Sequence, residues 1–300
     1  MKALITGING FVGPHLKQHL VNNGFEVFGT DISNGELVDY SVDLLDKQVV
    51  YDLISKVIPD FIFHLAAQSS VKLSFIKPEL TREINVTGTK NLLDAVKSIV
   101  PDSRILVVGS ADVYGVPDET PLTESSKLNP ISPYGKSRLE QEKLALSYGL
   151  NLVISRSFTH TGPGQKPIFV CSDFAKQIAE IENGKEAVIN VGNIDVKRDF
   201  MDVRDIVKAY LLALEKCNFN EVYNICSGNT YSIREILDIL LSMTEKQIKV
   251  EEDPTKLRKN DILLMEGNNS KFIEATGWKA EIPFEKTLKD LLDYWRKNIN

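Results

Sequence analysis

The stretch Lys2-Ala3-Leu4-Ile5-Thr6-Gly7-Ile8-Asn9-Gly10-Phe11-Val12-Gly13 decides the fold. Its first residues form a short apolar run that suits a buried strand, and a helical pattern begins near residue 12. The glycines between them allow a tight turn and let backbone amides approach a pyrophosphate. The positive end of the following helix favours the same negative charge. The stretch therefore predicts a dinucleotide site made of Gly7, Asn9, Gly10, Phe11, Val12 and Gly13.

Strand and helix patterns alternate through the first half of the chain. We expect strands at 2–6, 25–30, 60–65, 104–108 and 150–156, separated by helices at 12–23, 46–57, 78–98 and 134–148. Such alternation predicts an α/β fold, a Rossmann-type doubly wound parallel sheet. The later pattern predicts helices at 171–183, 203–216, 232–243 and 284–297. A smaller C-terminal α/β lobe that binds the substrate would be built mainly from the chain after residue 160.

The expected domain boundary lies near residue 160. Residues 1–160 would form the dinucleotide-binding domain, and residues 188–226 are expected to rejoin it. Residues 161–187 and 227–300 would form the substrate lobe. The boundary is not expected to be clean, because the chain returns to the sheet after it first enters the lobe.

Composition excludes several classes of partner. A net charge of -6 over 300 residues argues against nucleic acid or an anionic membrane as the main partner. The three cysteines are scattered, which suits a reduced, cytoplasmic compartment, and no apolar run is long enough for a signal peptide or a membrane span. His15 and His19 have helical spacing, but the other two histidines are remote in sequence, so we expect no metal.

Asp31 ends the second predicted strand, at the position from which an acid can accept hydrogen bonds from the adenosine ribose. A carboxylate there would also repel a 2′-phosphate. The following residues, Ile32-Ser33-Asn34, include no arginine that could bind such a phosphate. The pattern favours NAD as the cofactor, with NADP as the alternative.

A second set of polar residues follows the strand at 104–108. Ser110 and Asp112 come directly after it, which puts them at the carboxyl end of the sheet, where ligands bind in such folds. Tyr134 and Arg138 are four residues apart in a predicted helix and share one face. A cation one turn away favours the ionised form of a tyrosine, which then exchanges a proton with a substrate more readily. We predict that these four residues are catalytic.

Together these motifs resemble the extended short-chain dehydrogenase/reductases that act on nucleotide sugars, from Met1 to about Trp295. Tyr134 and Arg138 are similar to the Tyr-x-x-x-Lys signature of that superfamily, with arginine in place of lysine. The second half of the chain is most similar to the GDP-mannose 4,6-dehydratase relatives. Its matching stretches are Arg156–Gln165, Asp173–Gln177, Lys197–Val203, Tyr223–Gly228 and Leu257-Arg258.

The resemblance implies further site residues. Besides the glycine turn and Asp31, the cofactor would contact Asp43, Leu44, Leu65, Ala66, Ala67, Tyr134 and Arg138. The substrate would contact Ser70, Val71, Ser110, Thr159, His160, Arg198, Arg258 and Asp261. Within this set the two arginines would clamp a diphosphate, for which planar guanidinium donors are suited.

The implied activity is an NAD(P)H-dependent reduction of the C4 keto group of a GDP-4-keto-6-deoxy sugar, giving a GDP-rhamnose-type product for surface glycans. Asp112 stands where 4,6-dehydratases typically carry glutamate, and a shorter side chain weakens the case for dehydration. The alternatives are a 4,6-dehydratase or C4 epimerase that recycles bound NAD, and a nucleotide-sugar binder impaired by Arg138. The helices near 85–98 and 134–148 resemble the family's dimer-forming pair, so we expect a homodimer.

Overall fold

The computed structural model describes residues 1–256 and 262–299, and its largest element is a parallel sheet of seven strands. The strands run in the order β10-β6-β5-β4-β1-β2-β3, and each neighbouring pair is parallel. Their bounds are β1 Lys2–Thr6, β2 Glu26–Asp31, β3 Tyr40–Ser41, β4 Phe61–His64, β5 Arg104–Val108, β6 Leu152–Ser157 and β10 Glu221–Ile225. The predicted Rossmann-type sheet is confirmed.

Successive side chains along each strand point to opposite faces of this sheet, and both faces are buried. On β1, Ala3 and Ile5 face one apolar cluster, whereas Leu4 between them faces another. Helices on both sides cover these clusters, which is why the central strands are apolar without interruption. The first face is covered by α1 (Val12–Asn22), α8 (Val203–Lys216) and α10 (Ser270–Thr276); the second by α2 (Lys47–Val57), α5 (Gly88–Ile99) and α6 (Pro133–Leu146).

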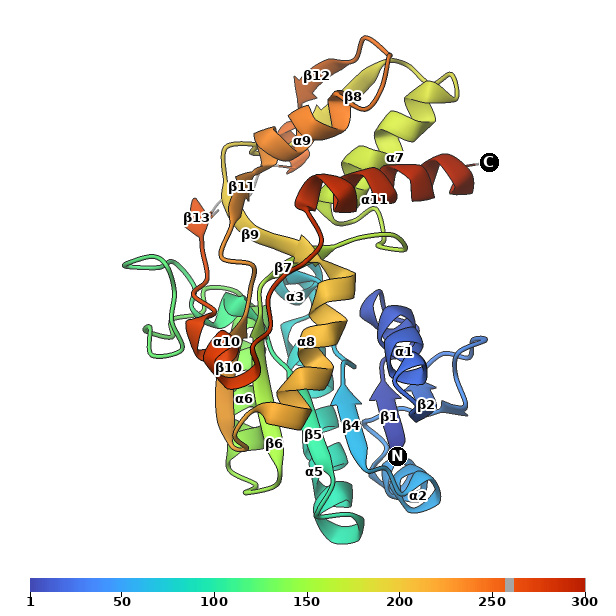
Figure 1. The fold of residues 1–300 in the computed structure, drawn as a ribbon, viewed down its shortest axis with the longest axis vertical. Coiled ribbons are helices and arrows are strands. Elements are labelled where there is room, and N and C mark those ends of the chain that lie inside the picture. The colour runs from blue at the N-terminus through green and yellow to red at the C-terminus, as the bar shows by residue number, and fades with distance from the viewer. Residues whose placement is uncertain (257–261, 300) are drawn as a thin grey trace.

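A smaller lobe lies beyond the carboxyl ends of the parallel strands (Figure 1). It holds a four-stranded sheet of β7 (Thr159–Thr161), β9 (Lys197–Asp202), β11 (Thr230–Ser232) and β13 (Leu264–Met265), and a pair made of β8 (Val188–Val191) and β12 (Lys249–Glu252). A third apolar cluster lies beneath α7 (Val170–Glu182), α9 (Ile233–Leu241) and α11 (Phe284–Asn298). Within residues 188–226, β10 joins the large sheet, while β8 and β9 belong to the lobe. The proposed domain division itself remains a prediction.

The prediction of one continuous α-helix at 78–98 is wrong, because a π-helical turn divides the segment. The segment contains α4 (Pro78–Arg82), a π-helical turn (Glu83–Thr87) and then α5; a further helix, α3 (Val71–Ile76), precedes it. Asn85, in the π-helical turn, is fully buried and hydrogen-bonds the backbone of Gln68 and the hydroxyl of Ser137. The wider turn directs this side chain inward, which periodicity alone does not reveal.

None of the helices in residues 1–256 and 262–299 combines the length and the apolarity that a membrane span requires.

A buried ion pair fixes α6 to the sheet. Arg156 on β6 donates to both carboxylate oxygens of Glu142 on α6, at 3.0 and 2.7 Å, and both side chains are almost fully buried. The same guanidinium also donates to the hydroxyl of Tyr114 and the carbonyl oxygen of Glu124. Because every charge in the cluster has hydrogen-bond partners, the pair holds α6 in one orientation at modest desolvation cost.

We predict that Glu142→Gln lowers the free energy of unfolding by about 3 kcal/mol, because it leaves the Arg156 charge buried without its counterion. Urea unfolding followed by circular dichroism measures this change. The matched control is Glu140→Gln on the same helix, since Glu140 pairs with Arg82 in solvent and such pairs contribute little. Equal effects of the two substitutions would contradict the role given to the buried pair.

Candidate active site

The ends of β1 and β4 mark the place where a ligand is expected. The chain continues from β1 to β2 on one side and from β4 to β5 on the other, so the connections diverge at this point. Such divergence leaves a crevice outside the carboxyl ends of the strands. Gly7 follows β1, and the partly exposed residues Leu65, Ala66 and Ala67 follow β4.

The glycine turn fits a dinucleotide. Gly7 has a φ of +74°, and a Cβ at Gly13 would lie 2.1 Å from the carbonyl oxygen of Ile8, so neither position accepts a side chain without rearrangement. Asn9 and Gly10, at the tip of the turn, are exposed, and α1 begins at Val12. The backbone N–H groups of Asn9 and Gly10 are already bonded within the protein, to Asp31 and Gly7, so it is the first turn of α1 that offers N–H groups to an anion.

Two of the predicted cofactor contacts, Asp31 and Asp43, are acids whose carboxylates accept hydrogen bonds from nearby backbone N–H groups. Asp31, partly exposed at the end of β2, accepts from the backbone N–H of Asn9 at 3.1 Å and of Ser33 at 3.3 Å. Asp43 accepts from the backbone N–H of Leu45 at 2.9 Å. These bonds place Asp31 beside the glycine turn, where its carboxylate borders the crevice.

Ser110 and Asp112 lie together just beyond β5. The Ser110 hydroxyl donates to the Asp112 carboxylate at 3.1 Å and accepts from the Asp112 backbone N–H at 3.2 Å. The short 3-10 turn Ala111–Val113 packs against α6, which carries the predicted tyrosine. The structure therefore brings the predicted serine and acid to the helix of Tyr134.

Tyr134 and Arg138 are in direct contact on α6. Arg138 Nε donates to the Tyr134 hydroxyl at 3.2 Å, and the guanidinium carbon lies 5.2 Å from the centre of the tyrosine ring. Both residues are buried, at 7 and 5 % exposure. Arg138 also donates to the carbonyl oxygen of Val108, the last residue of β5, at 3.1 Å. The arginine thus meets the tyrosine at the end of β5, beside Ser110.

A chain of buried polar groups connects this pair to the glycine turn. Gln141 accepts from Arg138 at 2.8 Å and donates to the Thr89 hydroxyl at 2.7 Å. Thr89 also contacts His64 Nε2 at 2.8 Å, and His64 Nδ1 contacts the Thr6 hydroxyl at 2.8 Å. The chain therefore runs behind the crevice, from Tyr134 on α6 to the end of β1.

Burial, with a smaller contribution from the Arg138 charge, lowers the pKa of His64 to about 3. His64 is therefore neutral at neutral pH, which its two hydroxyl partners accommodate.

The predicted substrate-binding residues lie on several different elements, and two of them lie outside the described residues. Ser70 is the N-cap of α3, where its hydroxyl accepts from the backbone N–H of Leu73, and Val71 begins that helix. Thr159 is exposed on β7; His160 stacks on Phe11 of the glycine turn, with ring centres 6.1 Å apart. Arg198 lies on β9 and donates to the carbonyl oxygen of Lys197. The predicted Arg258 and Asp261 lie outside the described residues.

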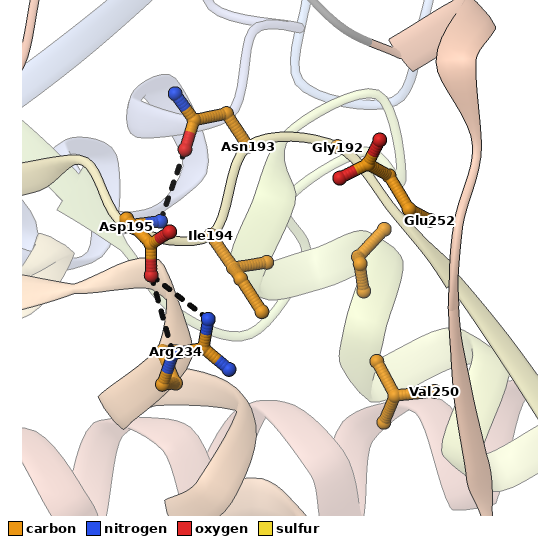
Figure 2. A pocket seen from close by; sticks show the side chains of 8 residues that line it. Gly192, Asn193, Ile194, Asp195, Arg234, Val250 and Glu252 are labelled. Carbon is orange, nitrogen blue, oxygen red and sulfur yellow. Dashed lines mark hydrogen bonds and ion pairs between the residues drawn. The ribbon is translucent and has the colours of Figure 1, made fainter.

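An open surface hollow lies elsewhere, in the smaller lobe. It has a volume of about 330 Å³ and is lined by β8, β12, the start of α9 and the turn that follows β8. Figure 2 shows the Asp195–Arg234 ion pair of 2.8 Å on its wall. None of the predicted site residues that the structure describes lines this hollow, so cavity size does not identify the active site here.

Sequence reasoning missed the polar residues behind the crevice. Gln141 lies three residues after Arg138, so Tyr134, Arg138 and Gln141 follow helical spacing and share one face of α6. That spacing is a usable signal. Thr89 and Thr6 gave none, because a threonine in an apolar segment is compatible with simple packing. Asn91 also escaped notice, although its amide donates to the carbonyl oxygens of Leu44 and Leu45 and so holds the loop of the predicted cofactor contacts Asp43 and Leu44.

Comparison with known proteins gives a consistent result. Residues 4–291 match the family model for GDP-mannose 4,6 dehydratase. The chain is 34% identical to GDP-6-deoxy-D-mannose reductase of Pseudomonas aeruginosa, over 99% of this chain and 98% of that one. It superposes on the structure of RMD from Pseudomonas aeruginosa complexed with NADPH with a TM-score of 0.90 and 34% identity, covering 99% of both chains.

A further solved relative is UDP-glucose 4-epimerase of Thermus thermophilus in complex with NAD. The TM-score is 0.89 and the identity 28%, over the whole of both chains. Nicotinamide cofactors are therefore bound by relatives that share this fold, in both the NAD and the NADPH form.

We predict that the neutral state of His64 makes stability depend on pH. Its pKa is lower in the folded protein than in the unfolded chain, so this contribution is complete above pH ~6.5 and is lost as the pH falls from there towards 3. The stability advantage of wild type over His64→Gln should shrink by about 1.4 kcal/mol between pH 7.5 and 5.5. Urea unfolding at both values measures this, and His19→Gln is the comparison, since burial lowers the pKa of the partly exposed His19 as well, so its pH-dependent change should be smaller. A constant difference would contradict the prediction.

Proposed function

Because the chain belongs to the GDP-mannose 4,6-dehydratase family, we propose that it reduces the C4 keto group of a GDP-4-keto-6-deoxy sugar with a nicotinamide cofactor. The chain is an oxidoreductase of the nucleotide-sugar class of short-chain dehydrogenase/reductases. The observation that carries the proposal is the buried contact of Arg138 with the Tyr134 hydroxyl at the end of β5.

In the proposed reaction each residue has a distinct task. Tyr134 delivers a proton to the C4 oxygen, and the fixed charge of Arg138 stabilises the tyrosinate that remains. Ser110 orients the same oxygen by donating its hydroxyl hydrogen, which turns to the substrate from the Asp112 carboxylate that accepts it in the free protein. The glycine turn and Asp31 hold the cofactor, which supplies the hydride when bound. Burial of Tyr134 and Arg138 strengthens their interaction, because little water screens it.

Asp112 bears on the choice between reduction and dehydration. The 4,6-dehydratases that this chain resembles typically carry a glutamate at this position, where it acts as base and acid at C5 and C6. The aspartate is one methylene shorter, and it is already hydrogen-bonded to Ser110. Both facts favour a role in orienting Ser110. The second candidate, an enzyme that recycles its cofactor, is supported by the presence of an acid here at all and by the likeness to a 4-epimerase.

Asp31 favours NADH over NADPH in this proposal. Its carboxylate lies beside the glycine turn, where it would accept from a ribose diol and repel a 2′-phosphate. NADPH is the alternative coenzyme, because a related protein was solved in complex with NADPH. The homodimer and the cytoplasmic location stay predictions.

The first test is NADH absorbance over time with purified protein and GDP-4-keto-6-deoxy-mannose, with the product identified by NMR. We expect stoichiometric NADH loss and a 6-deoxyhexose product. Tyr134→Phe should reduce kcat at least about 100-fold, because it removes the proton donor. Tyr51→Phe on α2 is the control and should leave kcat unchanged. Turnover without net NADH loss would instead indicate a recycling enzyme, and absence of any turnover a binding protein.

Coenzyme choice gives a separate prediction. Asp31→Asn keeps an oxygen for the Asn9 amide but removes the charge, so the ratio of kcat/KM for NADH to that for NADPH should fall about tenfold. Asp60→Asn, at the opposite end of the sheet before β4, is the control for loss of one charge. An unchanged ratio in Asp31→Asn would show that other residues select the coenzyme.

A further inference from the structure

Arg138 is a buried cation whose hydrogen-bond partners are all neutral. Its Nε donates to the Tyr134 hydroxyl at 3.2 Å, and its Nη1 donates to the Val108 carbonyl oxygen at 3.1 Å and to Gln141 Oε1 at 2.8 Å. The Gln141 contact is the shortest of the three, and Gln141 is itself only 1 % exposed. The orientation of the guanidinium therefore depends on a side chain that does not touch the tyrosine.

The orientation of Gln141 is in turn fixed by Thr89. The Thr89 hydroxyl has a single hydrogen, which it donates to the carbonyl oxygen of Asn85 at 2.7 Å. It must therefore accept from Gln141 Nε2, at 2.7 Å. A flip would place the amide N–H groups against the cation and the amide oxygen against a hydroxyl that has no hydrogen left to donate, so both contacts would be lost. Gln141 Oε1 is thus held towards Arg138.

We propose that Gln141 is a positioning residue that aims the Arg138 guanidinium at Tyr134, so that this site is built for arginine and not for lysine. The inference rests on the proposed function for its kinetic consequence, but its structural part holds without it. Gln141 acts only through Arg138.

The reason lies in the shapes of the two cations. A guanidinium is a rigid plane whose Nε and Nη1 point to separate partners, so one bond orients the other. A lysine ammonium is a single rotatable point, and Tyr134, Val108 and Gln141 would compete for it. Arg138→Lys should therefore not restore a better enzyme, although lysine is what the superfamily signature carries. We expect it to lower kcat/KM about tenfold, in line with the loss of a hydrogen bond to a charged group.

The first experiment observes Arg138 directly in the cofactor-free protein. Nitrogen-15 NMR resolves arginine Nε–H groups that are ordered and protected from solvent, and the Arg138 signal is identified by its absence in Arg138→Lys. Gln141→Met removes the acceptor and should accelerate exchange of that signal with water at least about tenfold. Gln141→Glu loses the donor to Thr89 but gains an ion pair with Arg138, and this stronger acceptor should preserve the signal. Gln48→Met, an exposed glutamine on α2, is the matched control.

The second experiment is a double-mutant cycle on kcat/KM. Gln141→Met should lower the rate about tenfold in the Arg138 protein but less than about twofold in the Arg138→Lys protein, since Gln141 acts through the arginine. A glutamine with a merely structural role would lower the rate by the same factor in both backgrounds.

Two results would overturn the proposal. One is an unchanged Arg138 signal in Gln141→Met; the other is an equal effect of that substitution in both backgrounds. If Gln141→Met does not fold, Thr89→Val tests the same link, because it frees the Gln141 amide and should also accelerate exchange of the Arg138 signal. If the protein turns over no substrate, the proposed function fails, while the NMR result still decides the role of Gln141.

Discussion

The active site depends on a buried positive charge without a carboxylate partner. Arg138 is 5 % exposed, and a hydroxyl, a backbone carbonyl and a side-chain amide provide its hydrogen bonds. Burying a cation in this way costs several kcal/mol unless oriented dipoles replace its water. A carboxylate would lower that cost but would also cancel the field at Tyr134. Neutral partners keep the charge effective, and this requirement explains why so many polar side chains are buried behind the crevice.

The same constraint links the cofactor end of the fold to the chemical end. The polar chain that begins at Gln141 passes through Thr89 and His64 and ends at Thr6, the last residue of β1. Burial and, to a smaller extent, the Arg138 charge lower the pKa of His64, so it is neutral where it links Thr89 to Thr6. Parallel pairing puts the ends of β1 and β4 side by side, so the sheet topology, and not the local sequence, is what brings Thr6 to His64. The fold and the electrostatics of the site therefore depend on each other.

Sequence reasoning reached the parts of the site that have local signals. The glycine turn, the acid after β2, and the Tyr134–Arg138 spacing are each defined within a few residues, and the parallel sheet follows from the alternation of strands and helices. It failed where structure depends on distant partners. The π-helical turn before α5 exists because buried Asn85 has partners at Gln68 and Ser137, and nothing in its own segment shows this. Residue roles in the site remain predictions even where the side chains meet.

Arginine at this position also limits how a proton reaches Tyr134. A guanidinium does not release a proton at accessible pH, so it orients the tyrosine but does not relay to it. Gln141 accepts from Arg138 with a carbonyl oxygen that has no hydrogen to pass on. The polar chain behind the crevice is therefore an electrostatic support and not a proton wire. A reductase consumes one proton in each turnover. In the reaction proposed for this chain, with Tyr134 as the donor, that proton would therefore have to arrive from the open side of the crevice.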